Sequence, residues 1–110
     1  MVNLNFDDIS TIEFQVNVSN KKYILREASG DAACKYRNAL LKSTKLSSDG
    51  KIQSIDGLAD IEPYLVSLCL FEQTDKGEKP VALHTIRSWP NRIQKTLFDE
   101  IKRISNLDEA

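Results

Sequence analysis

The strongest periodic pattern in this chain lies in its C-terminal third. Four branched apolar residues recur there at steps of four, four and three: Ile93, Leu97, Ile101 and Ile104. This spacing places them on one face of a helix, while most of the charged residues fall on the opposite face. Ser88 can cap such a helix and Pro90 is tolerated in its first turn. We therefore expect an amphipathic helix over about residues 89–105 whose apolar face packs on the rest of the chain.

The N-terminal part of the chain has the pattern of a β-hairpin. Residues 12–18 alternate strictly between apolar and polar side chains, which predicts a half-buried strand. A second short strand follows, and a turn at Asn20-Lys21 would pair Val18 with Tyr23 and Val16 with Leu25. A hairpin alone is marginally stable in water, so helices must cover its apolar face. The expected hairpin spans about residues 12–27.

Two further helices are expected in the middle of the chain. Ser29 can cap a helix over about residues 30–43. Its apolar side would contain Ala32, Ala33, Tyr36, Ala39 and Leu40. Asp60 can cap a helix over about residues 60–73, with Pro63 in the first turn. That second helix is apolar almost all round, which indicates either a buried central helix or one with a face for a partner.

The remaining segments read as connections. Residues 46–57 are rich in serine and contain two Asp-Gly pairs, which predicts a loop. The stretch TDKGEKP predicts a polar turn, and VALHTI after it predicts a short strand or an extended connector. A chain of 110 residues suits one domain over residues 1–110. The expected fold class is α+β, an N-terminal antiparallel β-hairpin packed on a small bundle of about three α-helices.

The cysteines, the first ten residues and the length of the apolar runs indicate the cellular compartment. Cys34 and Cys69 are isolated thiols within apolar helical patterns, without CxxC spacing, which favours a reducing environment. The first ten residues contain two aspartates and no basic residue, which is unlike a signal peptide. The longest apolar run, residues 65–71, is far shorter than the roughly 20 residues of a membrane span. We therefore expect a cytoplasmic protein with no membrane role.

Charge is unevenly distributed along the chain. Residues 21–45 hold seven Lys or Arg and two acids, residues 49–78 hold two and seven, and residues 87–103 hold five and two. One interpretation is that these are solvated faces that neutralise one another in the fold. The other is electrostatic complementarity to a partner or to a second copy of the chain.

Residues typical of catalysis and metal binding are sparse. His84 is the single histidine, and nothing local would activate Cys34 or Cys69 as a nucleophile beside it. Two distant cysteines and one histidine do not provide the close ligand pairs of zinc sites. A small acidic cluster consists of Asp56, Asp60 and Glu62. It lacks the spacing of a calcium loop. We expect no enzymatic activity, no cofactor and no metal.

One constellation resembles a ligand site. It lies where the last helix begins and consists of Arg87, Trp89, Asn91 and Arg92. Helix N-termini attract anions, arginines bind phosphates, and an indole can stack on a base. A nucleic-acid-binding module that uses Arg87, Trp89 and Arg92 is therefore an alternative. The net charge of −1 opposes it.

The order of elements resembles the small tail assembly chaperones of long-tailed bacteriophages and prophages. The resemblance rests on YILREASG, on Tyr36 and Arg37 in the first helix, on YLVSLCLF, and on the closing TIRSWPNRIQKTLFDEIKRISNL, which together span roughly residues 12–107. It implies a non-enzymatic protein of the host cell cytoplasm that binds the tape measure protein while tail tube subunits assemble around it. It also implies a possible homo-oligomer, and many members of the family have a longer, frameshifted form.

The resemblance provides no motif from which binding residues can be transferred. Candidate partner-binding residues are instead chosen because surplus apolar or basic side chains are expected at the surface: Tyr64, Leu70, Phe71, Trp89 and Arg92. The second helix would supply most of the surface for an apolar helical client. A structural connector subunit of the virion is a further alternative to the chaperone function.

Overall fold

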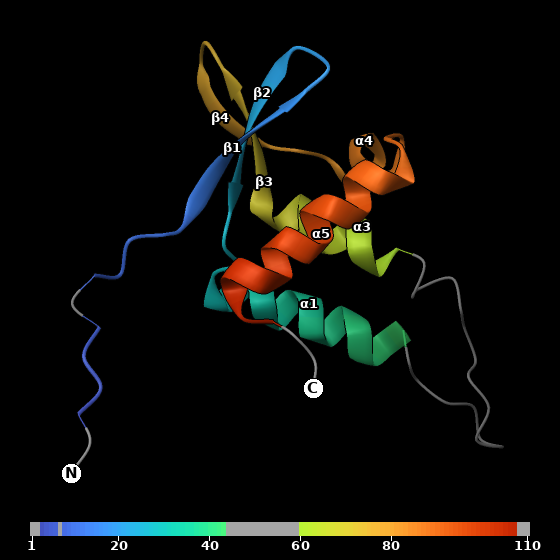
Figure 1. Ribbon diagram of the computed structural model, residues 1–110. Coiled ribbons are helices and arrows are strands. Elements are labelled where there is room, and N and C mark those ends of the chain that lie inside the picture. Colours follow the sequence, from blue (N-terminus) through green and yellow to red (C-terminus); the bar gives the residue numbers. More distant parts are fainter. Residues whose placement is uncertain (1–2, 7, 44–59, 108–110) are drawn as a thin grey trace, which may run out of the picture.

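A computed structural model describes residues 3–6, 8–43 and 60–107 of the chain. The elements in chain order are β1 (Glu13–Val18), β2 (Lys21–Arg26), α1 (Gly30–Ser43), α3 (Ile61–Cys69), β3 (Leu70–Thr74), β4 (Gly77–Pro80), α4 (Leu83–Arg87) and α5 (Asn91–Ser105). The described part is an α+β fold with a four-stranded antiparallel sheet of order β1-β2-β3-β4 (Figure 1). The expected α+β class is confirmed. The loop predicted over residues 46–57 lies outside the described residues.

The N-terminal hairpin is present, but its turn lies one residue earlier than predicted. Ser19 and Asn20 both have positive φ, 48° and 67°, as a tight two-residue hairpin turn requires. Val16 therefore pairs with Tyr23 and not with Leu25. The register differs from the predicted one by two residues, so every side chain stays on its predicted face of the sheet. The error changes neighbours along the strand and leaves the apolar face intact.

The helix predicted over residues 60–73 was wrong in its second half. Helix α3 ends at Cys69, and Leu70 is already extended, with φ −112° and ψ 132°. Strand β3 then pairs with β2, with Leu70 opposite Leu25 and Phe71 opposite Ile24. The run of apolar residues contains no glycine or proline at the junction, so the sequence gives no sign of where the helix ends.

A second hairpin, which the sequence analysis did not predict, joins β3 to β4. Its turn falls within the predicted polar turn, and Gly77 has φ 114°, a conformation that favours glycine. The Thr74 hydroxyl donates a hydrogen bond of 2.7 Å to the carbonyl oxygen of Gly77. Pro80 ends β4, an edge strand, where its missing N–H is tolerated. The sheet is therefore twice as wide as the expected hairpin.

The entrance to the last helix also differs from the prediction. Residues 83–87 form the short helix α4 and not a strand or extended connector. Ser88 does not cap α5, because its hydroxyl donates a hydrogen bond of 2.5 Å to the carbonyl oxygen of Thr85. Helix α5 begins at Asn91, after Pro90, and has no side-chain hydrogen bond at its N-cap.

The first helix matches its prediction. Helix α1 spans Gly30–Ser43, and the Ser29 hydroxyl accepts a hydrogen bond of 3.1 Å from the backbone N–H of Ala32, the N3 position of an N-cap. Its predicted apolar side faces the protein, with Ala33 and Tyr36 in the core and Ala39 and Leu40 half-buried.

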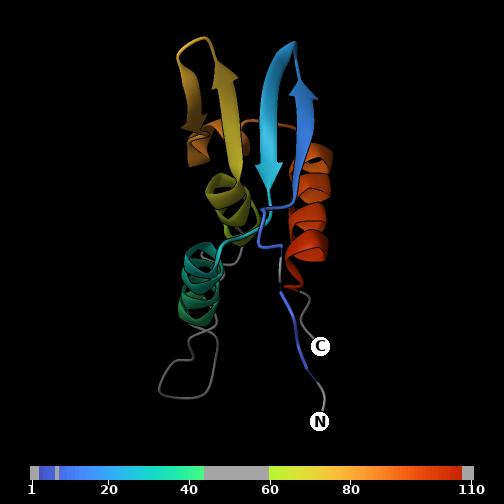
Figure 2. The ribbon, with the colours of Figure 1, turned by 90° about the vertical axis from the view of Figure 1, so that its left-hand side faces the viewer.

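Helix α3 lies at the centre of the domain and contacts α1, α4 and α5. The helices lie on one side of the sheet and below it, and the two hairpins extend beyond them (Figures 1 and 2). The side chains with less than 2% exposure are Leu25, Leu65, Val66, Cys69, Leu70, Ile86 and Ile101. They come from both layers, so one continuous core joins the sheet to the helices.

The caps of α1 and α3 provide a matched comparison. Replacing Ser29 with alanine removes the capping acceptor and should lower the free energy of unfolding by about 1 kcal/mol. Asp60 precedes α3 but makes no side-chain cap hydrogen bond, so Asp60→Ala should cost less, removing only an exposed ion pair. Urea denaturation of the two variants measures the difference. An equal loss in both would contradict the assignment of the caps.

Adjacent residues of β3 should respond oppositely to the same change. Leu70→Asp places a carboxylate at a position with 0% exposure, next to Leu25, and should unfold the domain. Phe71→Asp changes the opposite face of the sheet and should leave the domain folded. Circular dichroism and urea denaturation test both variants. A folded Leu70→Asp variant would contradict the burial of this strand face.

Candidate protein-binding surfaces

The constellation predicted for nucleic acid is largely engaged within the fold. The ring centroids of Trp89 and Tyr23 lie 5.5 Å apart at an interplanar angle of 74°, an edge-to-face contact. The Trp89 carbonyl oxygen also accepts a hydrogen bond of 2.8 Å from the side-chain amide of Gln94. Arg87 Nε lies 3.5 Å from Asp60 Oδ1. Trp89 is half-buried in this contact and thus fixes the α4–α5 turn on strand β2.

The second helix does not supply the predicted surplus surface. Leu70 is fully buried and lies in β3, so its assignment to a partner surface is wrong in this fold. Tyr64 is half-buried beside a shallow hollow of about 140 Å³ that Ala39 and Leu83 also line. The helix is surrounded by α1, α4 and α5, and this central position explains its apolar character.

Phe71 belongs to a different surface, the open sheet face. Its centre is one row of cross-strand neighbours, Gln15, Ile24, Phe71 and Pro80. Figure 2 looks onto this side of the sheet, and no described helix lies in front of the strands. Ile24 and Phe71 are half-buried and Pro80 is exposed. The row therefore crosses all four strands with an apolar centre.

A cluster of one arginine and two glutamates forms one border of the open sheet face. Arg26 Nε lies 2.9 Å from Glu13 Oε2, and Arg26 Nη2 lies 2.8 Å from Glu78 Oε2. The same guanidinium stands 5.0 Å from the centroid of the Phe71 ring. Hydrogen bonding to Glu13 raises the pKa of Arg26 above its ordinary value, with Glu78 adding to the effect. The cluster ties β1, β2 and β4 together and places the guanidinium over the ring of Phe71.

Two hollows flank the row. A hollow of about 410 Å³ lies beyond Phe71, where Leu68 and Ala28 add apolar lining. A smaller one of about 250 Å³ lies on the other side and is lined by Phe14, Ile24 and other residues of the sheet. An apolar centre with a polar rim is the composition of protein-binding surfaces.

Sequence reasoning missed the N-terminal arm, defined as the described residues 3–6 and 8–12. Its apolar side chains are among the most exposed of the described residues, with Leu4 at 80%, Phe6 at 78% and Ile9 at 88%. The arm leaves the body of the domain at the start of β1 (Figures 1 and 2). Three large apolar side chains exposed within six residues of the chain make the arm a candidate contact site. The only signal in the sequence is the presence of these residues before the first regular strand.

A groove that the sequence analysis also missed runs between β1 and α5. It encloses about 410 Å³ and is lined by Val16, Asn17, Val18, Ser19, Arg92, Ile93, Thr96 and Leu97. The valines and the α5 residues Ile93 and Leu97 form its apolar floor. Arg92, a predicted partner-binding residue, is exposed at its rim. We call this surface the β1–α5 groove.

The segregated charges pair within the fold, as the first interpretation of the charge pattern holds. Asp60 pairs with Arg87, and Glu62 Oε2 lies 3.3 Å from Lys95 Nζ. In the sheet, Glu72 Oε1 lies 3.6 Å from Lys21 Nζ. These contacts join the acidic middle of the chain to both basic segments. Part of the charge pattern is therefore satisfied by contacts within the described residues.

Reactive groups do not converge in the part of the chain that the structure describes. Cys34 is exposed on α1, so its predicted place in a buried stripe was wrong, while Cys69 is buried at the end of α3. His84 is exposed on α4. The described residues contain no group of three or more metal-ligating side chains, and none of the described helices has the length and apolarity to cross a membrane.

The two thiols should differ in reactivity. Burial raises the pKa of Cys69 from 9.0 to about 12, whereas Cys34 is open to solvent. A thiol-specific reagent should modify Cys34 alone in the native protein and both cysteines in denaturant. Because the unfolded chain releases the Cys69 proton near pH 9, the stability from this group is lost as pH rises from 9 to about 12. Rapid native modification of Cys69 would contradict its burial.

Comparison with known proteins found no match for this chain among protein-family models, curated protein sequences or solved structures. Its function is therefore argued from its own surfaces. The open sheet face, the N-terminal arm and the β1–α5 groove are the surfaces whose residues the fold leaves available. All three are suited to contacts with protein segments.

Proposed function

We propose that this protein is a non-enzymatic assembly chaperone of a long-tailed bacteriophage, which binds the tape measure protein while the tail tube assembles. The observation that carries the proposal is the open sheet face. Ile24, Phe71 and Pro80 form an apolar row there without a covering helix among the described elements. The resemblance of the sequence to small tail assembly chaperones supports the same class of client.

The dimensions of the open sheet face suit a helical client. Neighbouring strands lie about 4.8 Å apart, so a row across four strands spans about 14 Å. An α-helix with its side chains is about 10 Å wide. An amphipathic helix can therefore lie on the row with its apolar stripe against Phe71 and Ile24. The flanking hollows can receive side chains at the edges of that stripe.

A chaperone in this role must hold its client reversibly. A shallow face with a few apolar contacts provides such binding, because the free energy of association depends on a small number of well-buried side chains. Arg26 is already paired with Glu13 and Glu78, so it adds polarity at the border without presenting an unpaired charge to an apolar client. Such a face also shields the client from aggregation until tube subunits replace it.

The test is a pull-down of tagged protein from cells that produce the whole assembly, with bound chains identified by mass spectrometry. The wild type should recover a very long helical protein and tube subunits. Phe71→Asp should reduce that recovery at least tenfold, because it places a charge in the centre of the apolar row. Asn38→Asp is the matched control. It adds the same charge at an exposed position of helix α1, outside the sheet, and should retain most of the recovery.

The alternatives give different results in the same experiment. Recovery of nucleic acid would support the module that uses Arg87, Trp89 and Arg92 and would reject the chaperone. Presence of the protein in purified mature particles would indicate a structural connector subunit instead. Equal losses in Phe71→Asp and Asn38→Asp would show that the apolar row does not bind the client.

A further inference from the structure

We propose that the N-terminal arm of one copy of this protein binds in the β1–α5 groove of a second copy. The inference does not rest on the proposed function, since Leu4, Phe6 and the groove lie outside the apolar row of the open sheet face. Ile9 and Thr11, further along the arm, line the hollow beside Phe71. Four features of the described residues support it: the exposure of the arm, the free edge of β1, the direction in which the arm leaves the domain, and the charges of the two surfaces.

The arm has side chains that require burial. Leu4 and Phe6 are 80% and 78% exposed, and they are two residues apart. In an extended segment such residues point to the same face, so one side of the arm presents both to a single surface. Asn3 and Asn5 would lie on the opposite side. An extended arm can therefore place Leu4 and Phe6 against an apolar surface while Asn3 and Asn5 face water.

The groove offers a strand edge as well as an apolar floor. Strand β1 is at the end of the sheet, so one of its edges has no neighbouring strand. The N–H of Glu27 donates to the carbonyl oxygen of Ile12, which shows that even-numbered residues bond toward β2. The backbone groups of Glu13, Gln15 and Asn17 therefore point to the free edge, where an extended segment can add as a further strand.

The floor of the groove fits the arm. Val16 and Val18 line it from the strand, and Ile93 and Leu97 line it from α5. The volume of about 410 Å³ is in the range of ligand-binding pockets, about 300–1,000 Å³. Leu4 and Phe6 can enter it together while the backbone of the arm follows the edge of β1.

The arm of the same copy is directed away from its own groove. Ile12 is held to Glu27 by two hydrogen bonds of 2.9 Å, through the Ile12 N–H and the Ile12 carbonyl oxygen. The arm continues from that end of β1, whereas the groove lies at residues 16–19, near the hairpin turn. Figures 1 and 2 show the arm running away from the turn. A second copy is therefore the source of the arm that fills the groove.

The charges are complementary. The sequence over residues 3–12 contains Asp7 and Asp8 and no lysine or arginine. Arg92 stands exposed at the groove. Helix α5 begins there with no acidic residue in its first turn and no side-chain cap, so its N-terminus also favours an acidic segment. Electrostatic attraction thus adds to the apolar contact and orients the arm.

The contact joins unlike surfaces, since the arm leaves one end of β1 and the groove lies near the other. Such a heterologous contact adds copies head to tail unless two copies exchange arms reciprocally. Sedimentation velocity of the full chain over a range of concentrations should show dimers or longer species. Association of either stoichiometry supports the inference, provided that it depends on the arm and on the groove.

Variants of the arm test that dependence. Leu4→Asp/Phe6→Asp should raise the dissociation constant at least about tenfold, because two apolar side chains no longer enter the groove. Asn3→Asp/Asn5→Asp is the matched control, with the same added charge on alternate positions, and should still associate. Both pairs of sites are exposed, so the fold should be unaffected.

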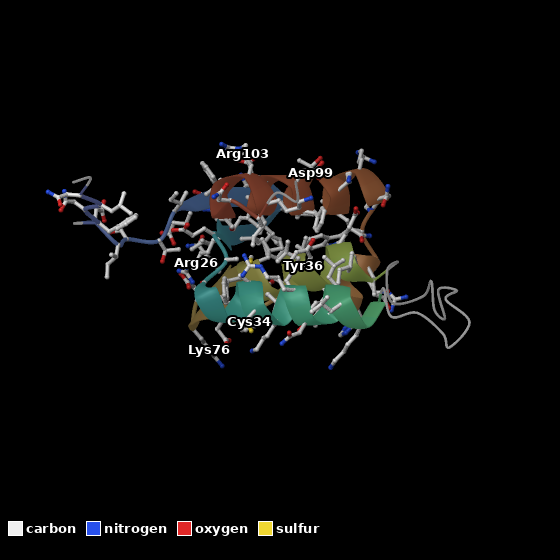
Figure 3. The ribbon with its side chains drawn as sticks, turned by 90° about the horizontal axis from the view of Figure 1, so that it is seen from below. Arg26, Cys34, Tyr36, Lys76, Asp99 and Arg103 are labelled. Atoms are coloured by element: carbon white, nitrogen blue, oxygen red, sulfur yellow. The ribbon has the colours of Figure 1, made fainter. Side chains whose placement is uncertain are left out.

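Variants of the groove complete the experiment. Thr96→Trp fills the groove from an exposed position of α5 and should make the protein monomeric. Asp99→Trp, which lies on the outward side of the same helix (Figure 3), is its control. A mixture of Thr96→Trp with Leu4→Asp/Phe6→Asp retains one intact arm and one intact groove, so it should form a dimer.

Three results would overturn the inference. A wild type that stays monomeric over the whole concentration range shows that the arm has no site on a second copy. Association that survives Leu4→Asp/Phe6→Asp shows that another surface joins the copies. Failure of the mixture to form a dimer, when circular dichroism shows that both variants are folded, shows that the arm does not bind in the groove.

Discussion

Helix α3 runs into strand β3 without an intervening residue, and this junction fixes the sheet relative to the helices. Cys69 ends the helix and Leu70 begins the strand, with exposures of 1% and 0%. Leu65 and Val66, one turn earlier, are fully buried among α1, α4 and α5. Helix α3 and strand β3 therefore form one continuous segment that passes from the centre of the helical layer to the centre of the sheet. The other elements pack around it, which explains why its sequence is apolar almost throughout.

This junction also marks how much of the fold could be predicted. The Ser29 cap, the bounds of α1 and the end of α5 follow from local signals, namely a capping hydroxyl and a regular apolar face. The end of α3 has no such signal, because Leu68, Leu70 and Phe71 are compatible with a helix or a strand. Pairing with β2 decides between them, and that pairing depends on residues more than 40 positions earlier. Tertiary contacts here determine the local structure.

The exposure of the candidate binding residues was less predictable than the fold, for a related reason. Apolar character marked Leu70, Phe71 and Trp89 equally, but their exposure depends on the face of a strand or on a neighbouring ring. Leu70 faces the core, Phe71 faces the open side of the sheet, and Trp89 packs edge-to-face on Tyr23. The arm and the β1–α5 groove escaped notice because neither has a periodic pattern. One is a segment before the first strand, and the other exists only where β1 and α5 meet.

Strand β1 connects the two surfaces on which the proposals rest. Its even-numbered residues, Val16 and Val18, line the β1–α5 groove, while Gln15 begins the row across the open sheet face. Alternation along a strand sends these side chains to opposite sides of the sheet. An arm seated in the groove would leave the apolar row uncovered. Ile9 and Thr11, further along the arm, line the hollow beside Phe71, so association between copies and binding of a client meet only at that edge of the open sheet face. Linked copies would then present several apolar rows to one long helix, and weak contacts at each row would combine into stable binding along its length.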